Sequence, residues 1–259
     1  MNFTPIAYTS SPYKQKFAIP RQPNLVQEAL GEIRFTREFS DANALRGLEQ
    51  FTHLWLVWVF HETAGQGWNA TVAPPRLGGT ERVGVFATRS MYRPNPIGLS
   101  VVEFAGVEQR GSELVLKVRG LDLLDGTPIL DIKPYLPYAD AVPDATGGFA
   151  AAAPQQQLEV HFSASAREQL AALQPKYPEL AAFITSVLKQ DPRPAQHKRK
   201  ETGKVFAMLL HDLNVRWQMH EADCEVPGGE VLGGEVLGCE VLSIEITGST
   251  QFPSKPGTR

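Results

Sequence analysis

The sequence predicts a mainly β protein, in which an N-terminal single-sheet β-barrel domain is followed by a small α+β C-terminal domain. Three observations predict this fold class. Seven runs of β-branched and aromatic residues, separated by glycine and proline, occur before residue 135. Apart from one short segment, helical periodicity begins only after residue 157. The first half also lacks the regular strand–helix alternation of a parallel α/β sheet.

The seven expected strands follow one another with short polar breaks. They are, in order, "FTPIAYT", "GEIRF", "HLWLVWVFHET", "RVGVFATR", "LSVVEFAGVEQ", "ELVLKVRG" and "TPILDIK". One helix is expected over Asp41–Gln50, with Ser40 or Asp41 as its N-cap. Its buried face would carry Leu45 and Leu48. Seven short strands with one helix favour a closed or nearly closed barrel.

The strand from His53 to His61 is apolar on both of its faces. One face carries Trp55, Val57 and Val59, and the other carries Leu54, Leu56, Trp58 and Phe60. A strand buried on both sides needs cover from outside its own sheet. A partner subunit or the second domain could supply that cover.

The pattern divides the chain into a barrel domain (1–137), a linker (138–157), an α+β domain (158–222) and a tail (223–259). The α+β domain should contain the strand "LEVHFS", two amphipathic helices, and two strands around a turn in "VFAMLLHDLNVRWQMH". The second helix should bury a stripe made of Leu180, Phe183, Ile184, Val187 and Leu188.

The tail repeats a glutamate every five residues, at Glu225, Glu230, Glu235 and Glu240. Because this period matches neither a helix nor a strand, we expect a mobile low-complexity extension without a function of its own.

Composition and charge limit the class of protein. With 42% hydrophobic and 20% charged residues, the chain is globular. Cys224 and Cys239 form no disulfide framework and no CxxC pair. The N-terminus lacks the apolar core of a signal peptide, and the longest apolar run is far shorter than the roughly 20 residues of a membrane helix. We therefore expect a cytoplasmic protein without a membrane anchor.

The net charge of −3 is concentrated in the last 37 residues, which hold two basic and six acidic residues. The remainder of the chain is close to neutral, so a local basic patch could still bind nucleic acid.

Other functional classes find little support. "GQGWNA" (65–70) fits a dinucleotide-binding pattern, but the following "TVAPPRLGG" cannot form the required helix. The six histidines show no metal-binding spacing, so no metal site is expected. A nucleophile elbow is absent as well.

Rigid loops and strand ends carry the candidate binding residues. Pro94 and Pro96 remove two backbone donors and hold Arg93 and Asn95 in extended conformations. In the stretch "AIPRQPNLV", Pro20 and Pro23 restrict Arg21 and Gln22 in the same way.

Further polar residues stand at strand ends, namely His61, Glu62, Arg89, Asp122, Asp125, Asp131 and Lys133. Asp125 and Gly126 are the expected turn. Singly, such residues are more often caps or salt-bridge partners. Together they suit a small zwitterionic ligand, because arginine grips a carboxylate and aspartate accepts from ribose hydroxyls. S-adenosylmethionine has these parts.

At these residues the chain resembles one family, over about Asn2 to Trp217. The resemblance rests on "SPYKQKFAIPRQP", "FTHLWLVWVFHET", "PPRLGGTERVGVFATRSMYRPNPIGLSVVE", "LDLLDGTPILDIKPYLPY" and "DPRPAQHKRKETGKVFAMLLHDLNVRW". The family comprises S-adenosylmethionine-dependent tRNA methyltransferases that methylate N6 of threonylcarbamoyladenosine beside the anticodon. No counterpart of the repeat tail is expected.

The resemblance implies a β-barrel catalytic domain and a homodimer with the cofactor near the subunit interface. It also implies a cofactor shell made of Pro20, Arg21, Gln22, His61, Glu62, Arg89, Leu99, Leu121, Asp122, Leu124 and Asp125. The motifs "RPNPIG" and "DIKPY" would line the substrate side.

The chemistry of the acceptor suggests roles on the substrate side. The target nitrogen must lose a proton, for which Asp131 is the candidate base. Asn95 or Tyr135 would orient the adenine edge. Lys133 or Arg93 would bind the threonyl carboxylate.

The "HKRK" loop is the expected contact to the tRNA anticodon region, through Lys198, Arg199 and Lys200 together with Lys204. Two alternatives stay open. The same fold could methylate another acceptor, or the barrel could be a non-catalytic RNA-binding module.

Overall fold

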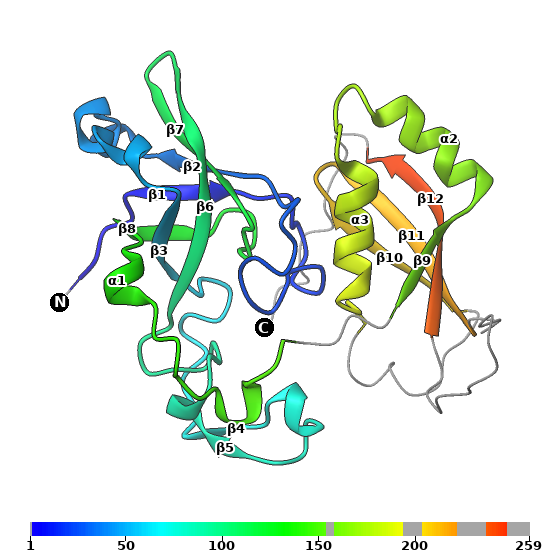
Figure 1. Cartoon of the computed structure of the whole chain (residues 1–259), viewed down its shortest axis with the longest axis horizontal. Coiled ribbons are helices and arrows are strands. Elements are labelled where there is room, and N and C mark those ends of the chain that lie inside the picture. The colour runs from blue at the N-terminus through cyan, green and yellow to red at the C-terminus, as the bar shows by residue number, and fades with distance from the viewer. Residues whose placement is uncertain (1, 154–157, 194–203, 222–236, 248–259) are drawn as a thin grey trace, which may run out of the picture.

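The computed structural model describes residues 2–153, 158–193, 204–221 and 237–247. Within the first part, six strands form one closed ring in the order β1-β2-β7-β6-β3-β8 (Figure 1). Their bounds are β1 Ala7–Ser10, β2 Gly31–Phe35, β3 His53–Val59, β6 Ile97–Arg110, β7 Glu113–Arg119 and β8 Pro128–Pro134. All neighbouring pairs are antiparallel. The predicted mainly β fold class is confirmed.

The ring closes over a short seam between β1 and β8. Only two positions pair there, Ala7 with Ile129 and Tyr8 with Pro128. Two further backbone bonds extend the seam, from Ile6 N to Ile129 O (2.8 Å) and from Thr9 N to Thr127 O (3.0 Å). The interior is filled by buried apolar side chains from every strand, among them Ala7, Ile33, Leu54, Leu56, Val102, Leu116, Val118 and Ile129.

Two expectations for the barrel half are wrong in detail. The run "RVGVFATR" adds no strand to the ring, because Val83–Gly84 (β5) pairs only with Thr71–Val72 (β4) and Val85–Ala87 turns into a 3₁₀ helix. The Arg93 guanidinium donates hydrogen bonds to Val85 O at 3.2 Å and to Thr88 O at 2.7 Å. These bonds favour the turn.

The helix expected over residues 41–50 is instead two 3₁₀ helices, Ala42–Leu45 and Leu48–Gln50. Gly47 interrupts them with a φ of +89°. Asp41 does cap the first, because its side chain accepts from Asn43 N at 2.9 Å.

The C-terminal part is a four-stranded sheet in the order β10-β11-β12-β9, with α2 and α3 packed on it (Figure 1, green to red). Its elements are β9 Glu159–Phe162, α2 Ala164–Leu173, α3 Leu180–Lys189, β10 Val205–Leu210, β11 Leu213–Glu221 and β12 Leu237–Ile246. The predicted stripe of α3 is buried as expected.

The expectation of a mobile repeat tail is wrong for its last repeat unit, which belongs to β12. Leu237–Ile246 lies inside the sheet, antiparallel to β11 and parallel to β9. Cys239 and Val241 point into the core, and Ile244 follows after a bulge opposite Arg216 and Trp217. This alternation of buried residues makes a strand of the last repeat unit. Glu225, Glu230 and Glu235 lie outside the described residues.

The expected linker starts later than residue 138. A short helix, α1 (Pro137–Asp140), packs against the barrel, because Asp140 Oδ2 accepts from Trp55 Nε1 at 3.0 Å and from Leu136 N at 2.8 Å. These bonds hold α1 to β3.

The connection after β1 joins the two parts of the chain. It runs along β10, with Tyr13 bridged to Leu210 and Pro12 O accepting from His211 N at 2.7 Å. Tyr13 is fully buried in the core of the C-terminal part, 5.8 Å from the ring of Phe183. The edge of β10 is therefore covered by the barrel's own loop.

We predict that Tyr13→Ala lowers the free energy of unfolding by about 3–5 kcal/mol, because it empties a fully buried aromatic site. Urea unfolding measures the change. Tyr13→Phe is the matched control. The buried hydroxyl has no hydrogen-bond partner among the described residues, so its removal should cost nothing. Equal losses in both variants would contradict this assignment.

Candidate functional site

One end of the barrel collects the connections that carry the candidate cofactor residues. In a ring of antiparallel strands, alternate strands run in the same direction, so β1, β7 and β3 end on one side. The connections that follow them are residues 11–30, 120–127 and 60–96. They contain Pro20, Arg21, Gln22, His61, Glu62, Arg89, Leu121, Asp122, Leu124 and Asp125. Leu99 stands on β6, close to the same end.

Direct contacts join these connections to one another. The Arg89 guanidinium donates to Gln22 Oε1. Asn24, with a φ of +63°, donates from its backbone N to Gly120 O (2.9 Å) and from its side chain to Val101 O (3.0 Å). A Cβ on Gly120 would lie 2.2 Å from Asn24 Oδ1, so glycine is required there. Sequence reasoning missed Asn24, because its role depends on contacts about 80 residues away.

A chain of hydrogen bonds leads from the barrel interior to Asp122. Trp58 Nε1 donates to Ser100 Oγ at 3.0 Å, and Ser100 Oγ donates to Asp122 Oδ1 at 2.7 Å. Burial raises the pKa of Asp122 to about 6, although the hydrogen bond from Ser100 and the charge of Arg89 oppose the shift. A carboxyl group with a raised pKa beside polar loops is typical of a ligand site. Ser100 was not predicted, although the buried Trp58 indole needs a partner.

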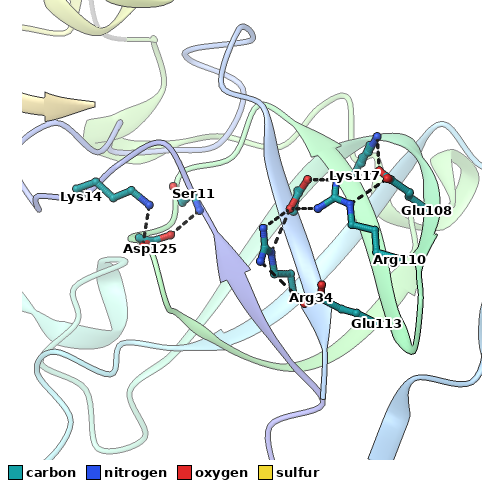
Figure 2. Close-up of polar contacts among 9 residues, drawn as sticks. Ser11, Lys14, Arg34, Glu108, Arg110, Glu113, Lys117 and Asp125 are labelled. Atoms are coloured by element: carbon teal, nitrogen blue, oxygen red, sulfur yellow. Dashed lines mark hydrogen bonds and ion pairs between the residues drawn. The ribbon is translucent and has the colours of Figure 1, made fainter. Parts of the chain in front are cut away.

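Asp125 holds the β1–β2 connection in place (Figure 2). Its Oδ1 accepts from Ser11 N at 2.9 Å, and its Oδ2 pairs with Lys14 Nζ at 2.8 Å. The expected turn is present, because Gly126 has a φ of +75° and Thr127 N donates to Leu124 O. Asp125 therefore positions the loop that carries Arg21 and Gln22.

In the stretch "RPNPIG", the Arg93 side chain is hydrogen-bonded within the protein, whereas the Asn95 side chain is exposed. Arg93 is partly buried, bonded to two carbonyls and stacked over Phe86, with 5.7 Å between its guanidinium carbon and the ring centre. Asn95 is exposed. His61 and Glu62 are neighbours in the turn that follows β3, with 3.9 Å between His61 Nε2 and Glu62 Oε1.

The "DIKPY" stretch covers the end of β8 and the residue after it, with Ile132 packed against the barrel core. Asp131 Oδ2 pairs with Lys133 Nζ at 2.7 Å. Tyr135 N donates to His53 O at one end of β3, whereas Ile97, two residues after Asn95, pairs with Val59 at the other end. Six residues of strand correspond to roughly 20 Å. The structure therefore does not bring Tyr135 and Asn95 together within one chain.

Between these two ends, the outer side of β3 and β6 is apolar. It consists of Trp55, Val57, Val59, Ile97, Leu99 and Val101 in paired register. Ile97 is 40% exposed and Leu99 is 51% exposed. The described residues of this chain therefore leave these two side chains of β6 partly uncovered.

A different side of the barrel carries charges that neutralise one another (Figure 2). Arg110 pairs with Glu32 at 2.6 Å and with Glu108 at 2.8 Å, and Lys117 also pairs with Glu108. The hydrogen bonds from Arg110 and Lys117 lower the pKa of Glu108 to about 2. These paired charges leave little net field to attract a nucleic-acid backbone.

The expected RNA contacts are only partly described. Lys204 precedes β10, with its Nζ 5.6 Å from the centre of the Phe206 ring. Lys198, Arg199 and Lys200 lie outside the described residues. In the part of the chain that the structure describes, no group of His, Cys, Asp and Glu is arranged to hold a metal ion. Over the same residues, no helix is long and apolar enough to cross a membrane.

The fold is a β-barrel with polar loops gathered at one end, and it is not a dinucleotide-binding α/β fold. In "GQGWNA", Gly65 and Gly67 have φ values of +87° and +80°, and the chain continues into β4 without a helix.

Comparison with known proteins identifies the family. A model of the tRNA-methyltransferase O N-terminal domain matches residues 8–141, and a model of the TrmO C-terminal domain matches residues 155–228. The chain belongs to the tRNA-methyltransferase O (TrmO) family, which confirms the resemblance in the sequence motifs. The second match continues into the segment expected to have no counterpart.

Two curated relatives and one solved structure cover nearly the whole protein. The chain is 53% identical to a tRNA (adenine(37)-N6)-methyltransferase of Escherichia coli, over 86% of this chain and 95% of that protein. It is 44% identical to RcsF, a putative S-adenosylmethionine-dependent methyltransferase of Pseudomonas aeruginosa, over 88% and 98%. The crystal structure of TrmO from Pseudomonas aeruginosa aligns with a TM-score of 0.72 and 37% identity, over 95% and 98%.

We predict that Asp122 makes stability depend on pH. Its ordinary pKa is 3.8 and its pKa in the folded chain is about 6. Between these values the unfolded chain has lost this proton while the folded chain keeps it, so stability falls as the pH rises from about 4 to about 6. Over this range, the free energy of unfolding falls by at most about 3 kcal/mol.

Urea unfolding between pH 4 and pH 7 measures this dependence. Asp122→Asn should remove the part of the pH dependence that comes from Asp122. The difference in free energy of unfolding between variant and wild type should therefore change between pH 4 and pH 7. A constant difference across the window would show that Asp122 titrates normally in the folded chain.

Proposed function

We propose that the chain transfers a methyl group from S-adenosylmethionine to N6 of threonylcarbamoyladenosine at position 37 of tRNA. Membership of the TrmO family supports this activity, and the named E. coli relative modifies adenine 37 in tRNA. The observation that carries the proposal is the convergence of three connections around Asp122 at one end of the barrel. Because tRNA is the substrate, we propose that the protein works in the cytoplasm.

The residues around Asp122 fit the chemistry of S-adenosylmethionine. Ionised Asp122 can accept hydrogen bonds from ribose hydroxyls and attract a sulfonium charge. Arg89 and Arg21 offer guanidinium groups for the methionyl carboxylate, and Leu99 offers an apolar contact. The bound cofactor supplies a methyl group activated by the sulfonium. The other shell residues are Pro20, Gln22, His61, Glu62, Leu121, Leu124 and Asp125.

Asp131 and Lys133 act together on the acceptor. In the free protein Lys133 pairs with Asp131 at 2.7 Å. A threonyl carboxylate bound by Lys133 would compete for that pairing and release Asp131 to accept the N6 proton. Asn95 or Tyr135 orients the adenine edge. Arg93 shapes the loop through its bonds to Val85 and Thr88, so Lys133 is the better carboxylate contact.

A homodimer completes the site. The substrate-side residues Asn95 and Tyr135 lie at opposite ends of β3, and the apolar surface between them exposes Ile97 and Leu99. A second copy packed on this surface would cover it and bring the β8 residues of one protomer near the loops of its partner. Lys204, with Lys198, Arg199 and Lys200, would bind the tRNA backbone.

We predict that the protein methylates tRNA only when the threonylcarbamoyl group is present. The carbamoyl group makes the N6 proton more acidic, and the threonyl carboxylate provides the anchor for Lys133. The measurement is transfer of labelled methyl from S-adenosylmethionine to tRNA with and without the modification. Labelling of unmodified tRNA would indicate another acceptor. Binding of both ligands without any transfer would indicate a non-catalytic module.

In the same assay, Lys133→Ala should lower methylation of modified tRNA at least tenfold and leave the affinity for S-adenosylmethionine unchanged. Lys117→Ala is the matched control, because Lys117 is a barrel lysine that pairs with Glu108 away from this site. An equal loss of cofactor affinity in Lys133→Ala would contradict its placement on the substrate side.

A further inference from the structure

A cavity lies where the β1–β2 connection runs along β10, outside the loop cluster around Asp122. Its volume is about 210 Å³. The lining residues that matter here are Phe17 from the barrel connection and Arg193, Lys204, Phe206 and Trp217 from the C-terminal part. Backbone bonds fix the connection in this place, including Lys14 N to Leu209 O.

Three of the residues that line this cavity are aromatic. Phe206 and Trp217 are paired across β10 and β11, and their rings stack with centres 4.9 Å apart and planes 26° apart. Phe17 lines the cavity and is 53% exposed, so part of its ring is open to a ligand. Flat aromatic surfaces of this kind are what nucleobases stack on.

One buried donor in the cavity wall lacks a partner. Trp217 is only 2% exposed, and its Nε1 has no hydrogen-bond partner among the residues that the structure describes. A buried indole N–H normally has an acceptor. Nucleobase edges carry carbonyl and ring-nitrogen acceptors, so a base bound against Trp217 would offer this donor a partner once the indole shifts to expose it.

Cations surround the aromatic walls. Lys16 Nζ lies 5.3 Å from the centre of the Phe17 ring, and Lys204 Nζ lies 5.6 Å from that of Phe206. Arg193 is buried and neutralised by Asp191, with bonds of 2.8 and 3.0 Å. The positive charge therefore comes from the ammonium groups of Lys16 and Lys204, which lie next to the aromatic rings.

We propose that this cavity takes one unstacked nucleobase of the tRNA substrate, with the adjoining phosphate between Lys16 and Lys204. The proposal rests on the proposed function, since it names a recognition site for the same substrate. Aromatic stacking, a donor for the base edge and cations for the phosphate are the three parts of single-stranded RNA recognition. An acidic peptide would use the lysines but not the aromatic walls.

The location of the cavity limits which base it takes. Phe17 precedes Pro20 by three residues, which span at most about 11 Å of extended chain. The same connection continues to Arg21 and Gln22 in the proposed cofactor shell. A base in the cavity therefore belongs to a nucleotide close to the target adenosine in the anticodon loop.

The test compares Phe17→Ala with Phe3→Ala in the full-length chain. Both side chains are exposed, so neither change should unfold the protein, and Phe3 is not among the residues that line the cavity. The probe is a threonylcarbamoylated anticodon stem-loop RNA. Phe17→Ala should weaken RNA binding about 5- to 150-fold, the usual effect of losing one base–aromatic stack. Phe3→Ala should bind like the wild type.

Abasic substitutions along the loop identify the base. At one position the abasic RNA should bind the wild type as weakly as intact RNA binds Phe17→Ala, and the two losses should not add. Additive losses at every position, or full RNA affinity in Phe17→Ala, would overturn the nucleobase site.

Methyl transfer and cofactor binding separate this proposal from the function on which it rests. Phe17→Ala should raise the KM for RNA with kcat and cofactor affinity unchanged. A wild type that methylates modified RNA while Phe17→Ala binds it equally well would overturn the nucleobase site alone. A wild type that transfers no methyl group to modified RNA would overturn the proposed function.

Discussion

The alternation of strand direction around the closed ring determines where the candidate cofactor residues lie. Because neighbouring strands are antiparallel, β1, β7 and β3 end on the same side, and their connections meet there. The seam between β1 and β8 pairs only two positions, with backbone bonds from Ile6 and Thr9 extending it. This seam holds the loop of Arg21 and Gln22 next to the turn of Asp122 and Asp125. The same loop continues along β10 and joins the two parts of the chain.

Electrostatics differ between the sides of the barrel. On β2, β6 and β7, acidic and basic side chains pair directly, and Arg110 contacts both Glu32 and Glu108. Asp122 forms no ion pair within the described residues, and its partner is the neutral hydroxyl of Ser100. Desolvation raises the pKa of this carboxyl. The positive charge of a sulfonium cofactor in the proposed site would favour the ionised form of this carboxyl.

Local pattern in the sequence predicted much of the fold. Six of the seven expected strands form the ring, and the stripe of α3 is buried as expected. Contacts distant in sequence escaped prediction. Arg93 bends residues 85–88 through their carbonyls, and the packing of Cys239 and Val241 makes a strand of the last glutamate repeat. Proline-bounded loops indicated where the candidate site lies, but Asn24 and Ser100 became visible only once the strands were paired.

The affinity for S-adenosylmethionine at pH 5 and pH 8, measured by calorimetry, tests the central claim that Asp122 marks the cofactor site. Its carboxyl must be ionised to bind, and its pKa is about 6. Wild-type affinity should therefore be about tenfold weaker at pH 5. Asp122→Asn should bind weakly at both pH values, and Asp131→Asn should behave like the wild type. The same pH dependence in Asp122→Asn as in the wild type would contradict the account.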